Sequence, residues 1–258
     1  MRIALGVEYD GTQFCGWQVQ EGVRTVQACI EQALAKVADH PVRVICAGRT
    51  DTGVHALGQV IHFDSEASRS ERGWVFGANS HLPKDCSVSW ARVVSDDFHA
   101  RYAALSRYYR YVIFNRAVRS GVFAKQVSWC YLPLDAVRMS EAAQYLIGGH
   151  DFSSYRAVAC QAKQPVRTVH RLDVVRHGER IVIDVVANAF LHHMVRNIAG
   201  VLMTIGSGER EPAWAQQVLE ARDRTLGGVT APPQGLTLMS VEYPEAYALP
   251  KPAAEAFF

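Results

Sequence analysis

The strongest constraint on the fold of this chain is an order of secondary structure that its two halves repeat. In the first half, the alternating apolar segment at residues 2–10 predicts a half-buried strand that ends at an Asp-Gly turn. Thr25 can cap the helix that follows, because apolar residues recur at helical spacing over residues 26–37. Two further strands are predicted at residues 42–46 and 59–64. The order is strand, helix, strand, strand.

The second half shows the same order. Residues 107–115 are strand-like, and residues 134–148 carry apolar side chains at helical spacing. Residues 166–176 and 180–187 flank a short turn that contains glycine, which predicts a hairpin. A further helix is predicted over residues 191–206.

We therefore predict an α+β fold of two similar halves, each a split β-α-β unit, with a boundary near residues 98–106. The sheets of two such units can join edge to edge. We divide the chain into a first half (1–103), a second half (104–245) and a tail (246–258). The tail contains two prolines and is predicted to be irregular.

The composition is that of a folded protein, with 49% hydrophobic and 20% charged residues in 258. No apolar run approaches the ~20 residues that cross a bilayer, and acidic residues near the N-terminus argue against a signal peptide. We therefore predict a cytoplasmic protein without a membrane partner. The six cysteines form no C-x-x-C pair and no cluster at zinc spacing, so we expect reduced thiols and no metal site.

The basic residues favour nucleic acid as a partner. Of 27 basic residues 22 are arginine, whose planar guanidinium suits phosphate and stacks on bases. Two stretches, between Asp97 and Asp135 and between Asp151 and Asp173, contain no acidic residue, and tyrosines alternate with arginines in the first. Such stretches suit unpaired RNA, but a solvated strand face with core tyrosines explains them equally well. The residues that we assign to an RNA-binding surface are Arg101, Arg107, Arg110 and Arg167.

The loop "GRTDTGVH" at residues 48–55 contains the Asp-Thr-Gly tripeptide of aspartic proteases. Such a protease needs two carboxylates that share one proton, and the chain has no second Asp-Thr/Ser-Gly. Arg49 would also place a cation beside that pair. The loop therefore does not indicate a protease.

Several stretches that run in order along nearly the whole chain closely resemble the tRNA pseudouridine synthase A family. They are "YDGTQFCGWQ" (9–18), "AGRTDTGVHALGQV" (47–60), "FHARYAALSRYYRY" (98–111), "GHDFSSYR" (149–156), "CQAKQPVRTV" (160–169), "FLHHMVRNIAG" (190–200) and "APPQGLTLMSVEYP" (231–244). The resemblance implies two ferredoxin-like halves joined into one extended, mainly antiparallel sheet flanked by helices. It also implies a homodimer that uses no metal or organic cofactor and isomerises uridines 38, 39 and 40 in the anticodon stem-loop of tRNA.

The same resemblance assigns roles to individual residues. Asp51 takes the role of the catalytic carboxylate, and Arg196 that of its ion-pair partner. Tyr109 matches the residue that stacks on the target base, although a tyrosine of a strand core remains an alternative. Arg49 matches the residue that displaces the base and holds the flipped nucleotide. Leu236 matches an apolar residue beside the base, and ordinary core packing explains it equally well.

Chemically, one ionised carboxylate suffices to move uracil from an N1 to a C5 linkage, either by attacking C1′ or by taking a sugar proton. The sequence leaves both routes open. Two other functions also remain as alternatives: a non-catalytic protein that binds or folds tRNA, and a hydrolase that would release free uracil.

Overall fold

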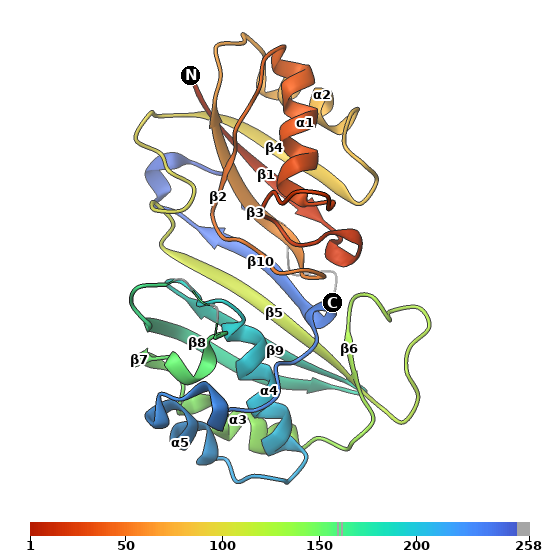
Figure 1. Cartoon of the computed structure of the whole chain (residues 1–258), viewed down its shortest axis with the longest axis vertical. Helices are drawn as coiled ribbons and strands as arrows, with labels where there is room; N and C mark the ends of the chain where they lie inside the picture. The colour runs from red at the N-terminus through yellow and green to blue at the C-terminus, as the bar shows by residue number, and fades with distance from the viewer. Residues whose placement is uncertain (159, 161, 252–258) are drawn as a thin grey trace. The chain divides into compact units, whose positions relative to one another are not determined.

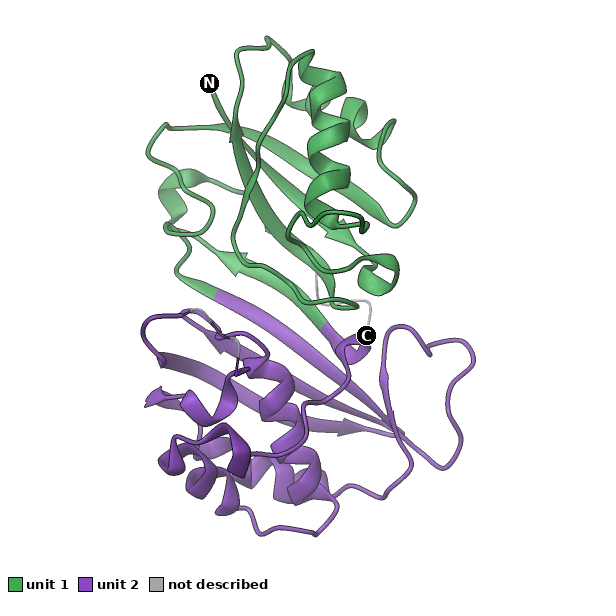
Figure 2. Cartoon of the chain, viewed as in Figure 1, with its two compact units in different colours: residues 1–106, 237–258 green, residues 107–236 purple. Residues whose placement is uncertain are grey.

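The computed structural model describes residues 1–158, 160 and 162–251, and in it the chain divides into two compact units (Figure 2). Unit 1 comprises Met1–Ser106 and the chain from Thr237 onward, and unit 2 comprises Arg107–Leu236. The second half predicted from the sequence comprised residues 104–245. In the structure the last strand, β10, pairs in parallel with β3 of unit 1, so the final segment belongs to unit 1 by its contacts. Of the predicted tail, residues 252–258 lie outside the described residues.

Unit 1 contains a sheet whose helices pack on one face (Figure 1). Its strands are β1 (Arg2–Tyr9), β2 (Ile45–Cys46), β3 (His55–Asp64), β4 (Cys86–Val94) and β10 (Leu236–Glu242), and its helices are α1 (Val26–Ala38) and α2 (Glu71–Asn79). β1 lies between β4 and β3, β2 pairs with β3, and all of these pairs are antiparallel. The order β4-β1-β3-β2 is that of a split β-α-β unit.

The predicted half-buried strand is buried on both faces. Ile3, Ala4 and Leu5 of β1 are all inaccessible to solvent. On the other face, Ala4 and the fully buried Phe98 belong to one apolar cluster, and Tyr243 packs against this cluster. Segments remote in sequence therefore cover the face that the alternating pattern left to water.

Among its described residues, unit 2 contains five further strands and three α-helices (Figure 1). Its strands are β5 (Ser106–Asn115), β6 (Ser128–Cys130), β7 (Gly148–Asp151), β8 (Val166–His177) and β9 (Arg180–Ala187), and its helices are α3 (Ala136–Gln144), α4 (Met194–Gly206) and α5 (Trp214–Ala221). The order β5-β9-β8-β7 is antiparallel throughout, and β6 runs parallel to β5. The predicted α+β class and the mainly antiparallel pairing are confirmed.

Two predicted local features are present in the structure. The hydroxyl of Thr25 accepts a hydrogen bond from the backbone N–H of Ala28, so Thr25 caps α1 as predicted. The turn between β8 and β9 contains Gly178 at φ +61°, a conformation that glycine adopts without strain.

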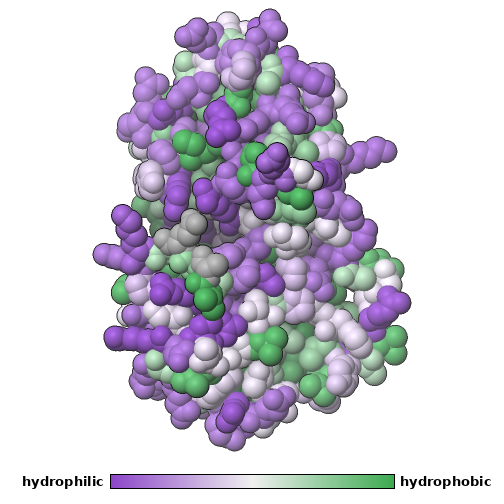
Figure 3. All heavy atoms as spheres, viewed as in Figure 1, coloured by the Kyte–Doolittle hydropathy of each residue, from purple (hydrophilic) through white to green (hydrophobic). Residues whose placement is uncertain are grey.

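Exposed apolar and aromatic side chains lie on and around β6, and green spheres are visible in this region at the lower right of Figure 3. They are Val118, Val122, Phe123, Trp129 and Tyr131, all at least 41% exposed. Among the described residues, no helix has the length and apolar character that crossing a bilayer requires.

A buried histidine makes unit 1 sensitive to acid. His62 is 2% exposed, and its Nδ1 accepts a hydrogen bond of 3.1 Å from the backbone N–H of Ala100. Burial, followed by the neighbouring His99 and Arg2, lowers the pKa of His62 from 6.5 to about 4. The folded state therefore favours the neutral ring. The contribution of neutral His62 to the free energy of unfolding is complete above the pKa of 6.5 that histidine has in the unfolded chain. It is lost as the pH falls toward about 4, the pKa of His62 in the folded protein.

We expect His62→Asn to remove much of this acid sensitivity, because asparagine keeps an acceptor for Ala100 and does not titrate. Between about pH 7.5 and about pH 4.5, the free energy of unfolding should fall by about 2–3 kcal/mol more in the wild type than in the variant. Urea unfolding at the two pH values measures this difference. Equal decreases in the two proteins would show that His62 does not carry the effect.

Candidate active site

Asp51 lies on the loop that joins β2 to β3, and hydrogen bonds hold this loop on both sides. The side-chain amide of Gln59 donates to the carbonyl of Gly48 at 2.7 Å, and the N–H of Trp17 donates to the carbonyl of Thr50 at 3.0 Å. The N–H of Val54 donates to the carbonyl of Asp51 at 3.1 Å, which closes a tight turn. Asp51 itself is partly exposed. Backbone hydrogen bonds therefore hold the part of the loop that carries the Asp51 carboxylate.

A buried hydrogen bond between two hydroxyl groups supports this loop. Tyr9 and Thr50 share a hydrogen bond of 2.8 Å between their hydroxyl oxygens. The ring of Tyr9 packs against Phe14 and Trp17, with centroid separations of 6.4 and 6.1 Å. Residues of the "YDGTQFCGWQ" stretch therefore support the residue before Asp51. Tyr9 was not predicted to support the site, because its place in the alternating pattern of β1 is that of an ordinary core residue.

Two glycines permit the close approach of this support. A Cβ on Gly11 would lie 2.0 Å from the carbonyl oxygen of Val54, and one on Gly16 would lie 3.0 Å from that of Thr50. The N–H of Gly11 donates to Nδ1 of His55 at 3.1 Å, so this imidazole fixes the end of the loop. Glycine is required where backbones come this near.

Tyr109 is a buried residue near the start of β5 in unit 2. Its side chain is 7% exposed and meets the ring of Phe190 edge-on, with centroids 5.1 Å apart. Tyr109 shares its face of the strand with Tyr111, whose hydroxyl donates to the carbonyl of Pro232 at 2.9 Å. The neighbouring Tyr108 points to the other face and donates to Asp184 at 2.8 Å.

Arg196 lies in the first turn of α4, where the loop before β10 holds it. Its Nε donates to the carbonyl of Ala231 at 2.8 Å, and the N–H of Ala231 donates back to the carbonyl of Arg196 at 3.1 Å. Burial raises the pKa of Tyr111, and the positive charge of Arg196 opposes this shift. Arg196 and Tyr111 bond to the adjacent carbonyls of Ala231 and Pro232, so both side chains hold the same loop. Leu236 ends the same loop and is 5% exposed.

The position of Arg196 is electrostatically unusual. The first turn of a helix carries a partial positive charge, which favours an acidic residue, yet the first turn of α4 contains none. A cation in the first turn loses only about 0.3–1 kcal/mol to the helix dipole, and the N–H groups of that turn attract an anion. The start of α4 is thus suited to a carboxylate or a phosphate.

The four arginines assigned to an RNA-binding surface differ in exposure. Arg107 is 8% exposed and donates to the carbonyl of Asn188. Arg110 forms two hydrogen bonds with Asp184, at 2.8 and 2.9 Å, which raise its pKa. Arg167 is partly buried, which lowers its pKa, and it donates to two backbone carbonyls. Arg101 is exposed, as is Arg49 of the Asp51 loop.

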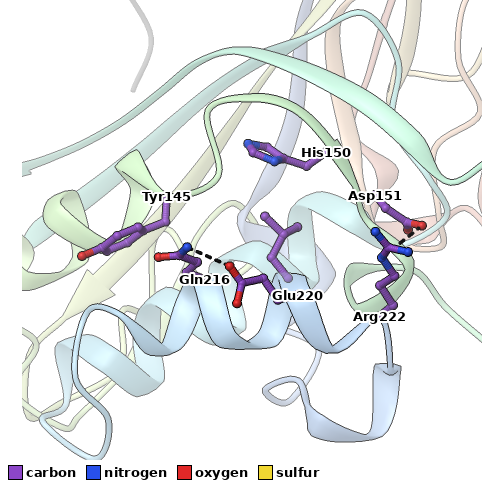
Figure 4. A pocket seen from close by; sticks show the side chains of 7 residues that line it. Tyr145, His150, Asp151, Gln216, Glu220 and Arg222 are labelled. Atoms are coloured by element: carbon purple, nitrogen blue, oxygen red, sulfur yellow. Dashed lines mark hydrogen bonds and ion pairs between the residues drawn. The ribbon is translucent and has the colours of Figure 1, made fainter.

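A pocket of about 200 Å³ in unit 2 involves none of the predicted site residues (Figure 4). Its lining comprises Tyr145, His150, Asp151, Gln216, Leu219, Glu220 and Arg222. Asp151 faces Arg222 at 3.8 Å, and Gln216 donates to Glu220 at 2.8 Å. Because four of its polar side chains pair with one another, we assign this pocket no catalytic role.

The chain matches known proteins over most of its length. A family model described as tRNA pseudouridine synthase matches residues 6–103 and 142–244, which include Asp51 and Arg196. The chain belongs to the tRNA pseudouridine synthase family. This membership confirms the predicted family and the predicted enzyme class, an isomerase that makes pseudouridine in tRNA.

Three relatives, each named tRNA pseudouridine synthase A, resemble the chain over nearly its full length. The protein of Alcanivorax borkumensis is 59% identical over 250 residues, covering 96% of this chain and 94% of the relative. That of Methylococcus capsulatus is 58% identical over 253 residues, covering 98% and 93%. That of Coxiella burnetii is 56% identical over 257 residues, covering 100% and 98%.

Proposed function

We propose that Asp51 is the catalytic carboxylate and that the synthase acts on uridines 38, 39 and 40 of the tRNA anticodon stem-loop. The observation that carries this proposal is the Asp51 loop, which lies within the family match and presents a partly exposed carboxylate. Hydrogen bonds from Trp17 and Gln59 hold the loop in place. A rigid support of this kind suits a group that must meet one carbon atom of a substrate.

The reaction needs few participants. The bond between N1 of uracil and C1′ of ribose breaks, the base turns, C1′ joins C5, and the proton on C5 leaves to solvent. Asp51 starts this sequence either by attacking C1′ or by removing a sugar proton. In our proposal Arg196 pairs with Asp51, Tyr109 stacks on the uracil, and Leu236 packs beside it.

The uridine must leave its stack before Asp51 can reach it. Flipping a base out costs a few kcal/mol, and stacking on an aromatic ring returns about 1–3 kcal/mol. Arg49 is exposed two residues before Asp51, so we assign it the phosphate of the flipped nucleotide. Exposed Arg101 extends this basic surface, whereas buried Arg107 and partly buried Arg110 and Arg167 would contribute less.

The oligomeric state and cellular location are part of the same proposal. We infer a homodimer that works in the cytoplasm, where the enzyme would meet tRNA. Exposed apolar side chains around β6, such as Phe123 and Trp129, support an association between copies. Light scattering on the purified chain tests it, since a monomer at micromolar concentration would contradict the dimer.

Position mapping tests the proposed substrate site. Unmodified tRNA transcripts with uridine at position 38, 39 or 40 are incubated with the protein and treated with a carbodiimide that marks pseudouridine. Primer extension should then stop at those positions and not at uridines of the other arms. Marks confined to another arm would contradict the assignment to the anticodon stem-loop.

A further inference from the structure

An exposed tyrosine has a fixed orientation on the turn that follows β4. Tyr102 is 77% exposed, yet its ring stacks on that of His99, with centroids 4.3 Å apart and planes at 30°. The ring of His99 in turn contacts that of buried His62 at 4.8 Å. Stacked neighbours therefore restrict a side chain that would otherwise rotate freely in water.

Backbone hydrogen bonds fix the same turn. Nδ1 of His99 accepts from the N–H groups of Arg101 and Tyr102, both at 3.2 Å. Nδ1 of His62 accepts from the N–H of Ala100 at 3.1 Å. Burial lowers the pKa of His99, which favours the neutral ring that can accept at Nδ1. A surface ordered in advance loses little conformational entropy when a ligand binds.

Positive charge lies beside this ring. The guanidinium carbon of Arg101 is 5.7 Å from the ring centroid of Tyr102. Arg101 and Arg49 both lower the pKa of the Cys46 thiol, which burial raises to about 12. Ala47 and Ala100 belong to one buried cluster, so the turn that carries Arg101 packs beside the start of the loop that carries Arg49 and Asp51.

The acidic residues before this turn, Asp96 and Asp97, have partners within the protein. Asp97 accepts hydrogen bonds from Ser95 and from the hydroxyl of Tyr247. Arg2 donates to the backbone carbonyl of Asp96, and the charges of Asp96 and Asp97 help to raise its pKa after the hydrogen bond with Asp64. An exposed aromatic face beside an arginine suits a ligand that combines a flat ring with phosphate.

We propose that Tyr102, stacked on His99, is a platform for an unpaired base that flanks the target uridine, with Arg101 binding an adjoining phosphate. This inference rests on the proposed function and adds a subsite to it. When a uridine flips out, its neighbours lose a stacking partner, and an aromatic face can replace that partner. The platform would hold the flanking nucleotide while Asp51 acts on the target.

A matched control is available in unit 1. Phe76 on α2 is 59% exposed, and the guanidinium carbon of Arg72 lies 4.5 Å from its ring centroid. It shares an exposed ring and a neighbouring arginine with Tyr102. If such a pair alone bound RNA, Phe76 and Tyr102 would respond alike to substitution.

The test compares binding and turnover of unmodified tRNA by the wild type, Tyr102→Leu, Tyr102→Phe and Phe76→Leu. Tyr102→Leu should raise Kd and KM about five- to thirtyfold, because base stacking typically accounts for such factors. Tyr102→Phe and Phe76→Leu should stay within about twofold. The slope of log Kd against log salt should not change in Tyr102→Leu, whereas Arg101→Gln should reduce it by about one.

A fluorescence measurement on the wild type requires no variant. An RNA hairpin with 2-aminopurine on either side of the target uridine should show quenching at one flanking position on binding. Absence of quenching at both positions would overturn the proposal, as would wild-type affinity in Tyr102→Leu. If these results came with normal pseudouridine formation by the wild type, the proposed function would stand. If the wild type made no pseudouridine, the proposed function would fail. The ratio of Kd for tRNA between Tyr102→Leu and the wild type would then decide whether Tyr102 is a platform.

Discussion

Asp51→Asn is expected to slow pseudouridine formation by a factor on the order of 10⁴, the scale seen when a catalytic nucleophile or base is removed. Asparagine has nearly the shape of aspartate but is neutral. It can neither attack C1′ nor accept a sugar proton. Hydrogen bonds through backbone groups of the loop, such as that from Val54 to the carbonyl of Asp51, remain possible. Single-turnover release of tritium from carbon 5 of uridine in tRNA measures the rate.

Binding and a matched variant separate a chemical effect from a folding effect. Asp51→Asn should bind tRNA at least as tightly as the wild type, because it removes a negative charge beside phosphate. Asp39 is an exposed aspartate in the left-handed conformation at the end of α1, which asparagine also adopts readily. Asp39→Asn should keep full activity. A fully active Asp51→Asn protein would exclude Asp51 as the catalytic group.

Arg196→Met should lower the rate by about 10²–10³, which is typical for the loss of one group that stabilises developing charge. The bond from Nε to the carbonyl of Ala231 fixes the guanidinium at the start of α4. Arg196→Lys keeps the charge but cannot reproduce this planar fork, so we expect an intermediate loss. The measurement is kcat and KM for tRNA, with the larger effect in kcat.

Arg180→Met serves as the control for Arg196, because Arg180 is an exposed arginine at the start of β9. It removes the same charge from the same unit without touching α4. Equal losses in Arg180→Met and Arg196→Met would indicate a general effect of charge on RNA binding. Such a result would contradict a specific role for Arg196.

Much of the fold follows from local patterns in the sequence. The cap at Thr25 and the turn at Gly178 are set by neighbouring residues, and both were predictable. The short helix α2 was not predicted. It has nine residues and contains Gly77, whose Cβ would lie 3.0 Å from the side chain of Val37. Glycine lowers helix propensity, so the sequence did not indicate a helix here. In the structure Gly77 allows α2 to pack closely against α1.

The support of the candidate site was harder to predict than its central residues. Asp51, Tyr109 and Arg196 were assigned through a resemblance, whereas the support by Tyr9 depends on a contact between residues 41 positions apart. Arg110 illustrates the same limit. Its partner Asp184 lies 74 positions away, so the absence of nearby acids along the sequence did not reveal the ion pair.

The most direct test of the account is the fate of uridine in tRNA incubated with the intact protein. The tRNA is digested to nucleosides, and pseudouridine, uridine and free uracil are quantified by liquid chromatography and mass spectrometry. We predict one pseudouridine gained for each uridine lost, with no free uracil. Tight tRNA binding without pseudouridine would indicate a non-catalytic RNA-binding protein, and free uracil would indicate a hydrolase. Either result would contradict the account.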